Sequence, residues 1–215
     1  MQFQTIELYK VVDIFLLLLI GVGPKIALVP FLSATADLDG KTRARVVRKM
    51  LVTAGVTALL LVVFGGILTR LLHFSSGALG IAGGLILLII AAGMMLGRGE
   101  QDDAHMSAAS SDPMSLATYP LAVPYLLNPA GIVVLVTFSA EAKTAGWFAV
   151  MIGLLALVIG IDVAVFRWAN RVSETLDQNR MLVTEKVFSI LLAAVAVQLV
   201  LYGLNDVGVI HLTPH

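Results

Sequence analysis

Two stretches of this sequence place a proline beside a residue that favours the start of a helix, each inside a long apolar run. Gly23 precedes Pro24 in the first stretch, and Asn128 precedes Pro129 in the second. Proline fits the first position of a helix, and Asn or Gly fits the position before it. We therefore expect each pair to begin a half-helix. Two kinked but continuous helices are the alternative.

Anion binding is the chemistry that such breaks allow. The start of a helix presents unpaired N–H groups and the positive end of the helix dipole, which together attract an anion or a carboxylate. Two such starts that face each other would make one site. The expected substrate-binding residues are the two four-residue stretches at the breaks: Gly23, Pro24, Lys25, Ile26, Asn128, Pro129, Ala130 and Gly131.

Two charged residues within apolar runs are candidates for charge pairing or ion coupling. A cation near the bilayer centre costs about 2.5–3.5 kcal/mol on insertion scales. Lys25 is expected to bind an anionic group of a substrate, to pair with Asp162, or to snorkel to the interface. Asp162 is expected to pair with Lys25, to carry a coupling proton, or to lie near the interface beside Arg167.

Three further polar side chains lie within apolar runs. Thr137, Ser139 and Gln198 are candidates for lining a polar path through the protein. Hydrogen bonding to a neighbouring helix is the commoner use of such residues in membranes.

The composition of the chain indicates the class of protein in which these residues lie. The chain of 215 residues is 59% hydrophobic and 13% charged, whereas soluble domains average roughly 45–50% apolar and about 25% charged. These values predict an all-α membrane protein. The formal net charge of zero argues against nucleic-acid binding. With no cysteine and four scattered histidines, we expect no metal and no cofactor. The sequence also offers no nucleophile–base set and no acidic diphosphate-binding motif, so we expect no catalytic residues and no enzyme.

The lengths of the apolar runs predict six transmembrane helices. A bilayer needs about 20 apolar residues in a helix. The expected spans are residues 11–32, 46–68, 77–96, 116–140, 145–166 and 186–204.

The distribution of positive charge predicts the orientation. Most of the 14 Lys and Arg residues fall between the first and second spans, after the third, or between the fifth and sixth. Cytoplasmic loops carry such an excess. We expect a multi-pass protein of the cell (inner) membrane with both termini outside the cytoplasm.

The two breaks also predict an internal repeat. They are about 105 residues apart, and each run continues into a Ser-Ala pair. Three spans in each half would make the second half inverted, as in many transporters, although so short a similarity in apolar sequence also arises by coincidence. The expected organisation is a first three-helix repeat at 1–97, a polar cytoplasmic linker at 98–115 and a second repeat at 116–215.

Small residues recur in the third and sixth spans and predict close helix packing. They are Gly77, Gly80, Gly83, Gly84, Ala193, Ala194 and Ala196.

Three stretches together resemble the MarC family, also described as SnatA-type or neutral amino acid transporter-like. The first begins at Ile81 and continues to Met95. The second, residues 120–124, precedes the later break, and the third joins the early break to residues 30–32 and Arg45. Family members commonly have Asn-Pro or Asp-Pro in span one and Gly-Pro-Gly in span four, so the two caps are exchanged here.

The resemblance implies six spans and a permease for small solutes such as neutral amino acids. Together with the breaks, it predicts transport of small neutral amino acids or related carboxylates by alternating access. A channel-like pore for a small solute and a non-transporting membrane scaffold are the alternatives. The expected partners are the solute and the lipid bilayer, with a second copy of the chain as a further candidate.

Overall fold

The computed structural model describes residues 8–36, 38–96, 112–142, 144–172 and 178–211. Regular structure in these ranges is helical, apart from one bridging contact between two loops. Four helices there are long and apolar enough to cross a membrane, which confirms the expected class of helical membrane protein. They are α3 (Gly40–Leu72), α4 (Ser76–Met95), α8 (Ala145–Val172) and α9 (Gln178–Asp206).

The first predicted break is confirmed, since the first apolar run forms two helices. Helix α1 (Leu8–Gly21) ends just before the break and α2 (Pro24–Ala34) begins with the expected proline. Proline has no N–H to lose at this first position, and its fixed φ suits a helix.

The second predicted break is also confirmed, and it is more irregular than the first. A short turn, α6 (Pro113–Leu116), leads into a widened helix, η1 (Ala117–Leu126), and α7 (Pro129–Glu141) follows the break. Within η1, Tyr119 and Val123 have extended dihedral angles directly before a proline. The proline ring disfavours the α conformation of the residue before it, so Pro120 and Pro124 each interrupt the helix.

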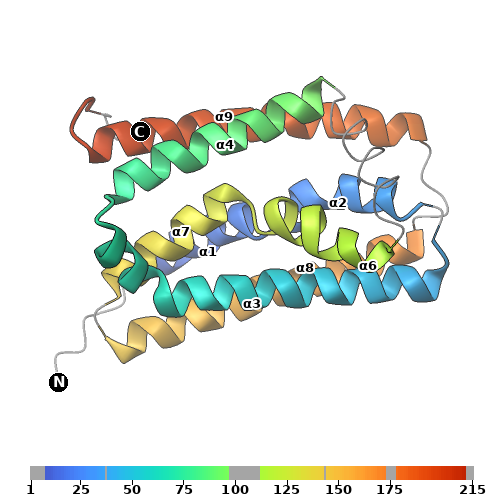
Figure 1. Cartoon of the computed structure of the whole chain (residues 1–215), viewed down its shortest axis with the longest axis horizontal. Helices are drawn as coiled ribbons and strands as arrows, with labels where there is room; N and C mark the ends of the chain where they lie inside the picture. Colours follow the sequence, from blue (N-terminus) through green and yellow to red (C-terminus); the bar gives the residue numbers. More distant parts are fainter. Residues whose placement is uncertain (1–7, 37, 97–111, 143, 173–177, 212–215) are drawn as a thin grey trace.

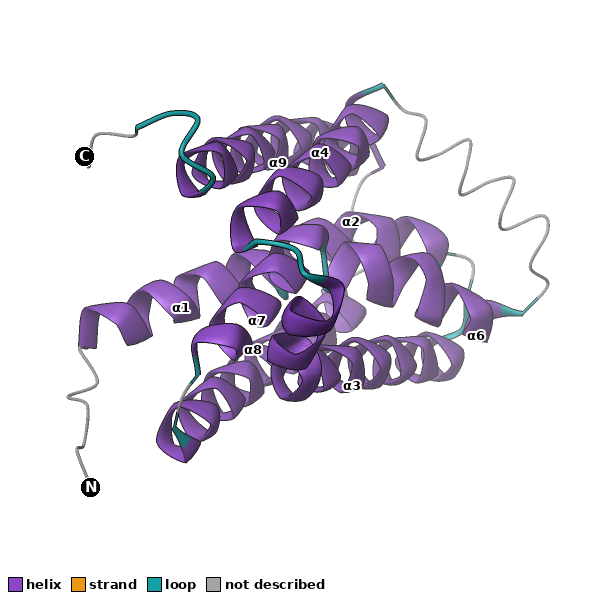
Figure 2. Ribbon diagram, turned by 60° about the vertical axis from the view of Figure 1, so that its left-hand side comes forward, coloured by secondary structure: helices purple, strands orange, loops and turns teal. Residues whose placement is uncertain are grey.

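The helices form three layers (Figures 1 and 2). Helices α4 and α9 make one outer layer, and α3 and α8 make the other. The two broken helices lie between them, with α1 beside α7 and α2 beside η1. Each layer therefore takes one helix from each half of the sequence, so the halves pack against each other throughout.

The outer layers present apolar side chains to their surroundings. On α3, for example, Val52 is 56% exposed and Ile67 is 59% exposed. In water this exposure would be costly, whereas lipid tails are as apolar as these side chains.

Helix α3 begins at Gly40, earlier than the span expected at 46–68. The Asp39 side chain accepts hydrogen bonds from the backbone N–H groups of Lys41 and Thr42 and caps the helix at Gly40. The cations at 41–49 therefore lie on the first turns of α3. Hydrogen bonds from Thr42, the largest cause, and from Lys41 lower the pKa of the exposed Asp39 carboxyl.

The polar linker predicted at 98–115 ends earlier than expected. Residues 97–111 lie outside the described part of the chain, whereas Pro113 to Ser115 are already helical. Asp112 caps this turn by accepting a hydrogen bond from Met114 N at 2.9 Å.

The predicted close packing of small residues is confirmed between α4 and α9. A Cβ atom added at Gly77 would lie 2.7 Å from the carbonyl oxygen of Gly203, and one at Gly84 would lie 2.7 Å from that of Ala196. The backbones approach closely because neither helix places a larger side chain between them.

Candidate functional site

The two helix breaks cross each other in the middle layer. Val22 and Leu127 form an isolated antiparallel bridge. The backbone N–H of Asn128 donates to the carbonyl oxygen of Gly21 at 3.0 Å. Segments about 105 residues apart in sequence therefore join where α1 ends and α7 begins.

The Asn128 side chain ties the end of one helix to the start of another. Its Nδ2 donates to the carbonyl oxygen of Ile20 at 2.8 Å. Its Oδ1 accepts from the backbone N–H of Gly131 at 3.1 Å. An unpaired carbonyl of α1 and an unpaired N–H of α7 are thus both satisfied. Asn128 is fully buried, so its main contacts are within the protein.

Glycines permit this crossing. A Cβ atom at Gly21 would lie 2.3 Å from Gly131 Cα, and one at Gly131 would lie 2.2 Å from the carbonyl oxygen of Gly21. Such separations are far below van der Waals contact, so the two breaks meet backbone to backbone. A side chain at Gly23 would likewise meet the carbonyl oxygen of Leu19 at 2.0 Å.

The first turns of α2 and α7 both contribute side chains to one buried cluster. Ile26 in the first turn of α2 and Ala130 in the first turn of α7 belong to the same buried cluster. Helices α4 and α9 cover this cluster with apolar side chains: Leu87, Ala91, Met94, Leu192 and Ala196. The first turns of both half-helices therefore lie under an apolar cover made by α4 and α9, and a shared anion site at the two starts stays a prediction.

The two starts differ in capping and in charge. Asn128 caps α7, whereas Gly23 has no side chain with which to cap α2. Lys25, the next residue but one, is exposed. The first N–H groups of α2 therefore lack the side-chain cap that α7 has, and Lys25 adds a positive charge in the same turn.

Asp162 is buried in α8 without a partner. It is 0% exposed, and neither carboxylate oxygen has a hydrogen-bond partner in the described chain. It lies one turn from Phe166, whose ring packs edge-on against Phe31 of α2 with 5.3 Å between centroids. The structure does not pair Asp162 with Lys25, nor does it place the carboxyl in water beside Arg167.

The three polar-path candidates lie in different environments. Ser139 Oγ accepts from Gly66 N at 3.0 Å and donates to the carbonyl oxygen of Val62 at 2.7 Å, so it bonds to the neighbouring helix α3. The hydroxyl of Thr137 is buried and has no hydrogen-bond partner among the described residues. Gln198 lies on an exposed face of α9.

Two cations that sequence reasoning assigned only to topology have structural roles. The Arg43 guanidinium is buried and donates to the carbonyl oxygens of Thr35, Ala36 and Leu38, just after α2. Lys186 Nζ donates to the carbonyl oxygen of Met94 at the end of α4 at 2.6 Å. Cations suit helix C-termini, but which helix each one reaches depends on the fold.

The described residues contain no group of three or more His, Asp or Glu side chains arranged to hold a metal ion. What the fold shows is an integral membrane protein of several apolar helices, two of which break and cross in its centre.

The profile of the MarC family of integral membrane proteins matches residues 8–207. The chain therefore belongs to the MarC family. It is 27% identical over 176 residues to a UPF0056 membrane protein of Methanocaldococcus jannaschii, covering 81% of this chain and 86% of the relative. It is also 26% identical to a UPF0056 membrane protein of Archaeoglobus fulgidus, covering 89% and 91%. No solved structure matches the chain significantly.

Proposed function

We propose that this protein is a permease for small neutral amino acids or related carboxylates and works by alternating access. The crossing of the two broken helices is the observation that carries the proposal. In helical transporters, substrate sites lie near the bilayer midplane where discontinuous helices begin, because their N-termini bind anionic groups. Irregular backbone at that depth also requires burial or a water-filled cavity.

The proposal includes six spans in two inverted repeats. In this view α1 with α2, and η1 with α7, are the first and fourth spans. Each layer contains one helix from each half, and the breaks meet in antiparallel register, as an inverted repeat requires. The proposed setting is the cell (inner) membrane, with both termini outside the cytoplasm.

The substrate carboxylate would meet the start of α2. Its first N–H groups are not capped by Gly23, and Lys25 adds a positive charge in the same turn. Asn128 already uses its Oδ1 and one donor within the protein, so it would hold the crossing in shape and leave direct binding mainly to backbone N–H groups and Lys25.

Asp162 is the proposed site of a coupling proton. A carboxylate ion without a partner in an apolar surrounding is costly, and protonation removes that cost. Intramembrane acids commonly mark proton relays for this reason.

The three layers suggest which parts move. Helices α4 and α9 cover the two half-helix starts and pack mainly on each other. We propose that this pair moves against the middle layer to open the site. The moving unit would then contain one helix from each half of the sequence, rather than one whole repeat.

Reconstitution tests the proposal. The purified protein is placed in liposomes, and uptake of radiolabelled glycine, alanine and small carboxylates is measured at two pH values. Saturable uptake with counterflow supports a permease, and flux that never saturates indicates a channel. If no solute is bound or moved by a protein whose helical content is intact, the proposal is wrong and a scaffold role replaces it.

A further inference from the structure

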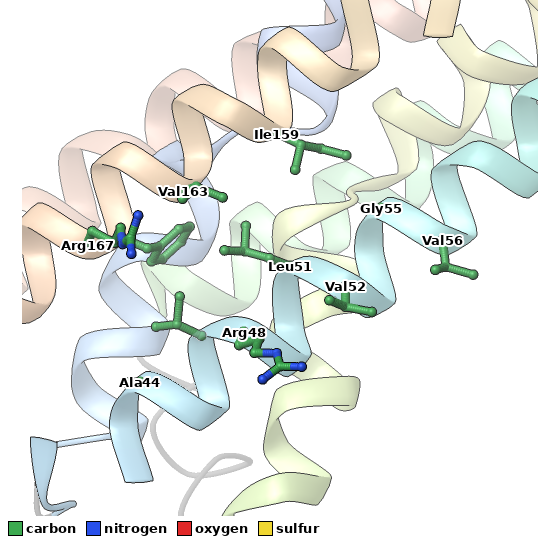
Figure 3. Close-up of a pocket in the computed structure, with 11 residues that line it drawn as sticks. Ala44, Arg48, Leu51, Val52, Gly55, Val56, Ile159, Val163 and Arg167 are labelled. Carbon is green, nitrogen blue, oxygen red and sulfur yellow. The ribbon is translucent and has the colours of Figure 1, made fainter. Parts of the chain in front are cut away.

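An apolar groove runs between α3 and α8 in one outer layer (Figure 3). It encloses about 680 Å³. Val52 and Val56 on its rim are 56% and 52% exposed. Because the surrounding face of α3 is apolar and exposed, the groove opens toward the hydrocarbon of the bilayer.

One end of this groove carries two cations. Arg48 of α3 and Arg167 of α8 both line it. Each lies roughly 12 Å along its helix from the apolar end, which Val56 and Ile159 mark. Both arginines are exposed, and neither has a hydrogen bond or ion pair within the described ranges.

The charged end lies at the level expected of lipid headgroups. Trp168 follows Arg167 directly and is 62% exposed. Tryptophan is enriched where hydrocarbon meets headgroups. The basic first turns of α3, at residues 41–49, lie at the same end. The positive-inside rule assigns this end to the cytoplasmic leaflet, where anionic lipids concentrate.

We propose that this groove binds an anionic phospholipid. The headgroup phosphate lies between the guanidinium groups of Arg48 and Arg167, which suit phosphate oxygens. One acyl chain lies along the groove on Leu51, Gly55 and Ile159. Cationic pockets between transmembrane helices on the cytoplasmic side bind such headgroups.

A second copy of the chain fits this groove less well than a lipid. A two-fold interface places the same patch of both subunits together. Because both subunits have the same orientation in the membrane, the charged ends of both grooves would lie in the same leaflet. Four guanidinium groups would then meet at one end, where the residues that line the groove include no carboxylate to balance them.

Native mass spectrometry of the full-length protein tests the proposal. The protein is released from mixed micelles that contain equal amounts of phosphatidylglycerol and phosphatidylcholine. The variant R48Q/R167Q is compared with K41Q/K49Q, which removes two exposed cations of α3 outside the groove. A third variant, G55L, fills the groove and keeps both arginines. A Cβ atom at this position would lie 3.1 Å from Ile159 Cδ1, the end of a flexible side chain.

The wild-type protein should retain phosphatidylglycerol in preference to phosphatidylcholine. Each groove arginine removed should lower the preference roughly fivefold, while K41Q/K49Q keeps it. G55L should lose retained lipid of both kinds, and its circular dichroism shows whether it has folded. An equal loss of the phosphatidylglycerol preference in R48Q/R167Q and K41Q/K49Q would overturn the proposal. A wild-type dimer that persists without lipid and dissociates in G55L would also overturn it.

Discussion

Asn128 holds the crossing together at the scale of single residues. Its side chain forms hydrogen bonds with a carbonyl oxygen in the last turn of α1 and with an N–H group in the first turn of α7. The sequence predicted its role as the cap of α7, because Asn before Pro is a local signal. Its bond to Ile20 joins residues 108 apart in sequence, so no local pattern contains it.

Replacing Asn128 with alanine should destabilise the protein by about 1–3 kcal/mol, since it removes the cap and leaves a buried carbonyl unpaired. Asn128→Ser is the matched variant, because its hydroxyl still accepts from Gly131 N but is too short to reach Ile20. We expect apparent melting temperatures in the order wild type, serine, alanine. Equal melting of all three would show that these bonds contribute nothing.

Asp162 should matter for coupling rather than for stability. A buried carboxyl without a partner carries a desolvation cost that an apolar side chain removes, and Val is closer to Asp in volume than Leu is, so Asp162→Val should melt at the wild-type temperature or above. Asp162→Asn should lose accumulation driven by a proton gradient and keep counterflow exchange. Asp13→Asn, at an exposed acid of α1, is the control and should retain both activities.

Coupled transport that persists in Asp162→Asn would remove this residue from the proton path. The sequence located Asp162 as an intramembrane acid but left its partner open. Its isolation depends on which helices surround α8, and the apolar sequences of α1, α2 and α3 do not specify that arrangement.

At the scale of elements, glycine decides how closely helices approach. Gly131→Ala should destabilise the protein by roughly 1–3 kcal/mol, as overpacking does, because its Cβ would lie 2.2 Å from the Gly21 carbonyl oxygen. Gly153→Ala in α8 adds the same methyl group where nothing lies within 4 Å. That control should melt like the wild type, and an equal effect of the two changes would contradict the crossing.

Helix breaks and small-residue faces could be predicted because prolines, caps and glycines act through neighbouring backbone. Helix ends were less predictable. The start of α3 depends on Asp39, whose side chain caps the helix. The end of the first span depends on Arg43, whose guanidinium donates a hydrogen bond to the carbonyl oxygen of Thr35, just after α2. Gly203 of α9 was not singled out, because a lone glycine acquires meaning only opposite Gly77.

At the scale of the whole molecule, the three layers decide which residues face lipid, solute or water. Composition predicted the membrane class, because a chain with so little charge cannot cover a soluble surface. The layers themselves could not be predicted, since every helix is apolar on most faces and hydropathy does not choose partners among them.

The orientation can be tested directly because the chain contains no cysteine. Ser75→Cys, in the turn between α3 and α4, should react with an impermeant maleimide in intact cells. Asp39→Cys, at the other end of α3, should react only after permeabilisation. The reverse labelling pattern would invert the proposed topology.

Binding of a solute where the two half-helices begin can be tested with a cysteine placed in that region. Ala130→Cys places a thiol at the start of α7, and Thr144→Cys places a control thiol at the exposed start of α8. Both proteins are reconstituted and treated with a small water-soluble thiosulfonate, with and without saturating alanine or glycine. We expect that the reagent modifies Ala130→Cys and that the amino acid slows this reaction, while the reaction of Thr144→Cys is unaffected by the amino acid. Unchanged reactivity of Ala130→Cys in a protein that transports that amino acid would show that the solute binds elsewhere.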